Sequence, residues 1–197
     1  MPVIISTETF TMITGTTKTL AYCSLLAALS VVLARLIIPM PDSTTRFSIE
    51  AVPIFLSGML FGPLTGGLVG FTADAVGTLF SGYGFNPLFC VPPILYGVFG
   101  GVFRYYLGRK CNFVRLLLAM LIPVVFGSIL YQSFTLAYVY YYETFWEGLI
   151  LKLTTRSVQF AVTIVLDVVA LDLLVKTRLF HRMGLWPPKA RKKEVEQ

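Results

Sequence analysis

The stretch LILKLTTRSVQFAVTIVLDVVALDLLV, residues 149–175, indicates the fold class. The hydrocarbon core of a bilayer needs about 20 predominantly apolar residues in one helix, which this stretch supplies. Five further apolar stretches precede it, at residues 17–38, 48–61, 64–80, 92–107 and 113–137. We therefore predict an all-α integral membrane protein whose six transmembrane helices form one bundle. It would be a single membrane domain, with an N-terminal segment 1–16, a bundle 17–175 and a basic tail 176–197.

The composition excludes a soluble globule. Hydrophobic residues make up 56% of the chain, charged residues only 13%, and the mean hydropathy is +0.76. A soluble domain carries about 25% charged residues. Residues 1–16 lack the basic and apolar regions of a cleavable signal peptide, so the first span is expected to remain uncleaved, as a transmembrane helix. The spacing of Cys23, Cys90 and Cys111 does not suggest a disulfide framework.

The basic residues predict the orientation. With six spans, twelve of the sixteen Lys and Arg residues fall on the side that holds both termini. The positive-inside rule places that side, and both termini, in the cytoplasm. The basic tail is expected to contact anionic membrane lipid rather than nucleic acid, because nothing around it could stack on bases.

Polar residues of the last span share one helical face. Lys152, Arg156, Gln159, Thr163 and Asp167 follow one another at steps of three or four residues. Ionisable groups at membrane depth are costly and usually face a cavity or a partner. The alternative for Lys152 and Arg156 is that they snorkel to the membrane surface. For Asp167, a basic partner near the cytoplasmic end is expected.

Other polar groups are predicted to gather with this face in the outer half of the bundle. Asp74 in the third span could pair with Arg35 or Arg156, or it could accept hydrogen bonds from a heterocycle. Several cations and few anions suit an anionic ligand, and aromatic walls suit a flat nitrogen ring. The predicted substrate-binding residues are Arg35, Arg46, Asp74, Tyr83, Phe85, Asn86, Gln132, Arg156 and Gln159.

Small residues mark places where helices meet closely. Gly62, Gly66 and Gly70 recur every four residues at the start of the third span, and Ser24 and Ala28 have the same spacing in the first. Such stripes let helix backbones approach. They could pack inside this bundle or dock another membrane subunit.

Motifs of catalysis do not occur in the sequence. The chain has no G-x-x-x-x-G-K-[ST], no H-E-x-x-H, no G-x-S-x-G and a single histidine, His181. We expect neither an enzyme nor a metal or other cofactor, and ATP-driven transport would require other subunits.

Several segments are similar to a known family. RFSIEAVPI at 46–54, GMLFGP at 58–63 and GGLVGFTADAVG at 66–77 resemble the substrate-binding S components of energy-coupling factor (ECF) importers, closest to the folate-specific group. The similarity extends through GYGFNP at 82–87, the YGxxGG pattern at 96–101 and ALSVVLAR at 28–35. It covers roughly residues 18–175.

The resemblance implies a six-helix S component of a prokaryotic plasma membrane. Such a protein binds a water-soluble vitamin at high affinity and associates with a membrane T component and two ATPase subunits. Toppling in the bilayer then carries the vitamin across. The small residues Ser24 and Ala28 would meet the T component.

The resemblance also suggests roles for individual residues. The pterin ring of folate would pair with Asp74 or Gln159, and its glutamate carboxylates with Arg46 or Arg35. Asn86 and Arg156 complete the set of best contacts.

Three other functions compete with folate uptake. The first is transport of another vitamin, and the second is a solitary, proton-coupled transporter acting through Asp74. The third is a non-catalytic membrane partner protein. A lipid enzyme would need an acid–base pair or a metal cluster at one interface, which the sequence does not offer.

Overall fold

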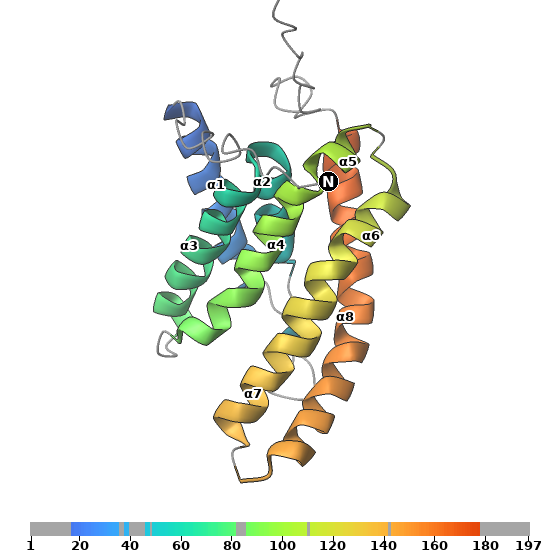
Figure 1. The fold of residues 1–197 in the computed structure, drawn as a ribbon. Coiled ribbons are helices and arrows are strands. Elements are labelled where there is room, and N and C mark those ends of the chain that lie inside the picture. The colour runs from blue at the N-terminus through green and yellow to red at the C-terminus, as the bar shows by residue number, and fades with distance from the viewer. Residues whose placement is uncertain are drawn as a thin grey trace, which may run out of the picture.

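The computed structural model describes residues 17–35, 38–39, 46–47, 49–81, 86–109, 111–141 and 143–177. Its α-helices are α1 (Thr17–Leu33), α2 (Ala51–Phe61), α3 (Pro63–Ser81), α4 (Val91–Val102), α5 (Arg104–Arg109), α6 (Phe113–Pro123), α7 (Gln132–Tyr140) and α8 (Phe145–Lys176). The 3-10 helix η2 (Pro87–Cys90) leads into α4, and the π-helix η3 (Val124–Tyr131) connects α6 to α7. Figure 1 shows these elements as one bundle, in which α7 and the start of α8 reach beyond the ends of α3 and α4. The predicted all-α bundle is confirmed.

The later helices are long enough to cross a membrane. Within the described residues, two helical segments are long and apolar enough to cross a membrane: Phe113–Tyr140, which comprises α6, η3 and α7, and helix α8. The apolar helices α1, α2 and Pro87–Val102 are shorter. Large apolar side chains are exposed around the outside of the bundle, such as Leu20, Leu79 and Val158. A helix with apolar residues on its outward face is typical of a membrane span.

The predicted end of the first span is wrong. Helix α1 ends at Leu33, and Ile38–Pro39 (β1) instead pairs antiparallel with Arg46–Phe47 (β2). A residue before proline is disfavoured in helical conformation, and proline itself has no N–H to continue the helix. Pro39 therefore favours the extended backbone that the strand requires.

The fourth predicted span, 92–107, is also not a single helix. Helix α4 ends at Val102, Phe103 is its C-cap, and α5 begins at Arg104. Gly100 and Gly101 lie in the last turn of α4, and glycine lowers helix stability by about 1 kcal/mol relative to alanine. The helix is therefore weakest where it breaks.

Helix α2 lies in the core of the bundle. Every one of its residues is buried, and Phe55 and Met59 have no exposed surface. They belong to a core cluster with Leu116 and Met120 of α6 and residues of α8. The short α2 thus connects the N-terminal and C-terminal helices.

Glycines let α3 and α4 pack with their backbones in contact. A Cβ atom at Gly66 would lie 2.3 Å from the Gly97 carbonyl oxygen, and one at Gly70 would lie 2.3 Å from the Pro93 carbonyl oxygen. Of the two possibilities for this stripe, internal packing is therefore confirmed for Gly66 and Gly70. Gly62 has a different role: it forms the turn between α2 and α3, where its φ is 107°, a conformation that favours glycine.

Candidate ligand-binding site

The predicted polar face of α8 points into the bundle. Lys152, Gln159, Thr163 and Asp167 are 5%, 7%, 5% and 2% exposed, and Arg156 is half-buried. Residues between them, such as Val158 and Val162, point outward and are at least half exposed. The spacing of three and four residues thus separates a polar inner face from an apolar outer one. For Lys152 the snorkelling alternative is wrong, since its side chain is buried.

Arg156 connects α8 to the neighbouring elements η3 and α7. Its Nη1 donates hydrogen bonds to Gln132 Oε1 at 3.0 Å and to the Ser128 carbonyl oxygen at 3.2 Å. Its guanidinium also lies 5.8 Å from the ring centre of Phe160. The structure therefore brings together Arg156 and Gln132, two predicted site residues from different helices.

A second buried contact brings α4 to the same place. The hydroxyls of Tyr96 and Ser128 are 2.9 Å apart, and both side chains are buried. Tyr96, Ser128, Gln132 and Arg156 therefore form one polar centre between α4, η3–α7 and α8, which we call the central cluster.

The π-helix positions the Ser128 part of this cluster. It begins after Pro123, which cannot donate a backbone hydrogen bond. Short π-helical segments widen a helix and are frequent at functional sites. Sequence reasoning missed Ser128 because a single serine in an apolar helix is usually structural. It missed Tyr96 too, although the YGxxGG pattern contains this residue.

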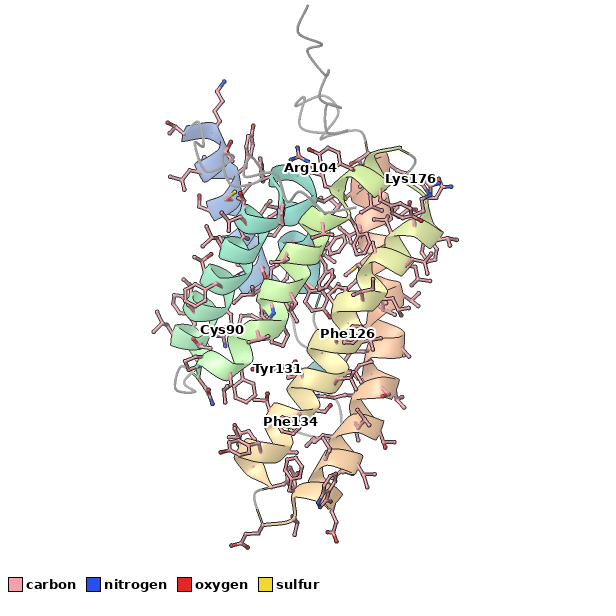
Figure 2. All side chains as sticks on the ribbon, viewed as in Figure 1. Cys90, Arg104, Phe126, Tyr131, Phe134 and Lys176 are labelled. Atoms are coloured by element: carbon pink, nitrogen blue, oxygen red, sulfur yellow. The ribbon has the colours of Figure 1, made fainter. Side chains whose placement is uncertain are left out.

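Three other predicted residues make hydrogen bonds with partners outside the central cluster. Asp74 Oδ2 accepts a hydrogen bond from the Cys90 thiol at 2.9 Å. The Asn86 side chain caps η2 by accepting a bond from the backbone N–H two residues later. Arg35 Nη2 donates to the Gly77 carbonyl oxygen at 2.9 Å, at an exposed position. Figure 2 shows Cys90 at about the level of Phe126, well below Arg104 and Lys176.

Some predicted residues lie outside the described part or on its surface. Tyr83, Phe85 and the side chain of Arg46 lie outside the described residues, although the Arg46 backbone is part of β2. Ser24 and Ala28 are exposed on the outward face of α1, while Cys23 is buried. Neither small residue of this stripe is therefore buried inside the bundle.

Comparison with known proteins assigns the fold to a family. A family model described as the ECF-type riboflavin transporter, S component, matches residues 14–176. The chain belongs to this S-component family. It is therefore a membrane transport protein, and the family supports a binding subunit rather than an enzyme.

Two relatives of this S component are named for folate. The folate transporter FolT of Clostridium novyi (strain NT) is 32% identical over 100 residues, which are 50% of this chain and 56% of that protein. The alignment thus spans about half of the curated relative. The crystal structure of FolT bound with folic acid matches with a TM-score of 0.68 and 27% identity, covering 82% of this chain and 95% of that one.

Proposed function

We propose that this S component binds folate from outside the cell and delivers it across the membrane as part of an ATP-driven ECF importer. The observation that carries the proposal is the likeness to folic-acid-bound FolT over 95% of that chain. The central cluster adds chemical support, because it places a guanidinium, an amide and two hydroxyls together inside a predominantly apolar bundle. A few convergent polar groups in an apolar setting are typical of small-molecule sites.

Within this site, Arg156 is the proposed main contact for an anionic part of the ligand. A guanidinium can bind a carboxylate through two parallel hydrogen bonds, and Arg156 would exchange Gln132 for the ligand. Gln159, buried on the same face, would offer both a donor and an acceptor to the pterin edge. Arg46, Tyr83, Phe85 and Asn86 remain proposed contacts of the ligand.

Riboflavin is the second candidate, because the matching family model is named for it. Two observations favour folate over riboflavin. The named relatives are folate transporters. In addition, the inner face of α8 carries the cations Lys152 and Arg156, which suit the carboxylates of folate and have no equivalent partner on neutral riboflavin.

Delivery requires partners and an orientation, which are also part of the proposal. A T component and two ATPase subunits would energise transport, and the exposed Ser24 and Ala28 of α1 would dock the T component. Both termini would face the cytoplasm of a prokaryotic cell. Arg104 and Lys176 support this orientation, since they lie at one end of the bundle (Figure 2) and the positive-inside rule places basic residues in the cytoplasm.

The test is calorimetric titration of folate into the purified chain in detergent, with an Arg156→Ala variant. Losing a hydrogen bond to a charged group costs about 1.5–3 kcal/mol, so we expect affinity to fall roughly 10- to 150-fold. Arg115→Ala is the matched control, since Arg115 contacts the Tyr106 ring on a different helix and should leave binding unchanged. Equal folate affinity in the Arg156→Ala and Arg115→Ala chains would reject the site, and no folate binding by the wild type would reject the function.

A further inference from the structure

Arg104 is a partly buried arginine at the end of the bundle that also holds Lys176 (Figure 2). Its Nε atom is fully buried and has no hydrogen-bond partner among the residues that the structure describes. A guanidinium is always charged in proteins, and burying part of it without an acceptor is costly. Since most buried polar groups have a partner, the unpartnered Nε points to a ligand that supplies an acceptor.

Helix α5 determines how Arg104 can be reached. Leu107 follows three residues later on the same face of this helix and has no exposed surface. Tyr105 and Tyr106, on the other side of α5, are 62% and 44% exposed. Arg104 therefore begins on the inward face of α5, and the part of it that remains exposed lies at the end of the bundle.

The charge of Arg104 is not neutralised by an acid among the described residues, where no salt bridge joins it to one. Asp172, an acid at this end of α8, is already bonded to Lys176 at 2.6 Å. Arg115 of α6 adds a second cation, with its guanidinium 5.1 Å from the ring centre of Tyr106. This end of the bundle would therefore attract an anion.

The elements that carry these cations also expose apolar side chains. Val102 at the end of α4, Tyr105 on α5 and Val114 at the start of α6 are 56%, 62% and 63% exposed. A small anion would leave this surface uncovered, whereas the acyl chains of a lipid would pack against it. Arginine binds phosphate through two parallel hydrogen bonds, and basic sites between helices at a membrane surface bind anionic headgroups.

We propose that Arg104 is the centre of a binding site for the phosphate of an anionic phospholipid. The phosphate oxygens accept hydrogen bonds from the Arg104 guanidinium, and Arg115 adds attraction from α6. The acyl chains lie along the exposed apolar side chains of α4 and α6. In the proposed orientation this lipid belongs to the cytoplasmic leaflet, which carries anionic lipid. The inference goes beyond folate uptake and does not depend on folate binding.

Native mass spectrometry of the detergent-solubilised chain, titrated with phosphatidylglycerol or phosphatidylcholine, tests this site. Both lipids contain a phosphate, but only phosphatidylglycerol has a net negative charge. We expect one phosphatidylglycerol to bind the wild type at least fivefold more tightly than phosphatidylcholine. Arg104→Met should lower phosphatidylglycerol affinity about tenfold, because a charge-assisted hydrogen bond is lost. Phosphatidylcholine should bind both chains alike.

Lys176→Met is the matched control. It removes the same charge at the same end of the bundle, but Lys176 is already paired with Asp172. Its phosphatidylglycerol affinity should therefore differ from that of the wild type by less than about threefold. Inorganic phosphate at the same concentration as the lipid should not displace phosphatidylglycerol.

Four results would overturn the lipid site. Equal losses in Arg104→Met and Lys176→Met would mean general attraction to a basic surface. Displacement of the lipid by an equal concentration of inorganic phosphate would assign Arg104 to a free anion. Unchanged lipid binding by Arg104→Met would refute the site, and failed assembly of that variant with the importer subunits would then assign Arg104 to a partner's acid. Should Arg104→Met fail to fold, equal affinities of the wild type for the two lipids would refute the site.

Discussion

The contact between α3 and α4 makes Gly97→Ala the most informative change for the fold. A Cβ atom at Gly97 would lie 2.0 Å from the Gly66 carbonyl oxygen and 2.2 Å from its carbon. Real Cβ atoms essentially never come closer than 3.0 Å to such neighbours, so the helices would have to separate by about 1 Å. Both opposing atoms are backbone atoms, and no side-chain rotation can remove the clash.

The expected magnitude follows from two opposing effects. Overpacking costs about 1–3 kcal/mol, and we expect the upper end of this range because backbone must move. Alanine recovers about 0.5–1 kcal/mol of helix stability relative to glycine. The net loss should therefore be about 2 kcal/mol, which increases the unfolded fraction by roughly 30-fold.

Gly77→Ala is the matched control for this prediction. It lies on α3, and a Cβ atom there would have no neighbour within 4 Å. We expect it to be neutral or to stabilise the chain by about 0.5–1 kcal/mol. The assay is equilibrium unfolding in mixed detergent–SDS micelles, followed by circular dichroism. If Gly97→Ala proves as stable as Gly77→Ala, the close backbone packing of α3 and α4 is refuted.

Three further predictions concern single contacts. Tyr96→Phe leaves the buried Ser128 hydroxyl without its partner, so unfolding should cost about 1–3 kcal/mol less and folate should bind more weakly, as thermal unfolding and calorimetry would show. Ser30→Ala removes a 2.8 Å bond to the Glu50 carbonyl oxygen and should destabilise the chain by about 1 kcal/mol, whereas an unchanged melting temperature would show that this bond contributes nothing. Ala28→Trp should leave folate binding in detergent intact but abolish ATP-dependent uptake by the reconstituted importer, and normal uptake would exclude this face of α1 as the docking surface.

Regular spacing made much of the fold predictable. The steps of three and four residues from Lys152 to Asp167 define the inner face of α8, and the glycines at positions 66 and 70 mark the contact with α4. The strand pair at Ile38–Pro39 was not predictable in the same way. Each of the two strands contains only two residues, which is too short to show an alternating pattern.

The site was predictable only where charge or depth singled out a residue. Arg156 and Gln132 are unusual in apolar spans, so the sequence identified both, but it could not show that they bond to each other. The burial of Lys152 was missed because a lysine near the end of a helix can reach water, unless a residue such as Tyr141 covers it. Asp167 was expected to have a basic partner. Instead its Oδ1 is buried without a hydrogen-bond partner among the described residues.

Folate specificity can be tested by titrating folate and riboflavin, side by side, into the wild-type chain in detergent. We expect saturable one-to-one binding of folate and no measurable binding of riboflavin at the same concentrations. A chain that binds riboflavin and leaves folate in solution would contradict the proposed specificity, while remaining an S component by fold and family.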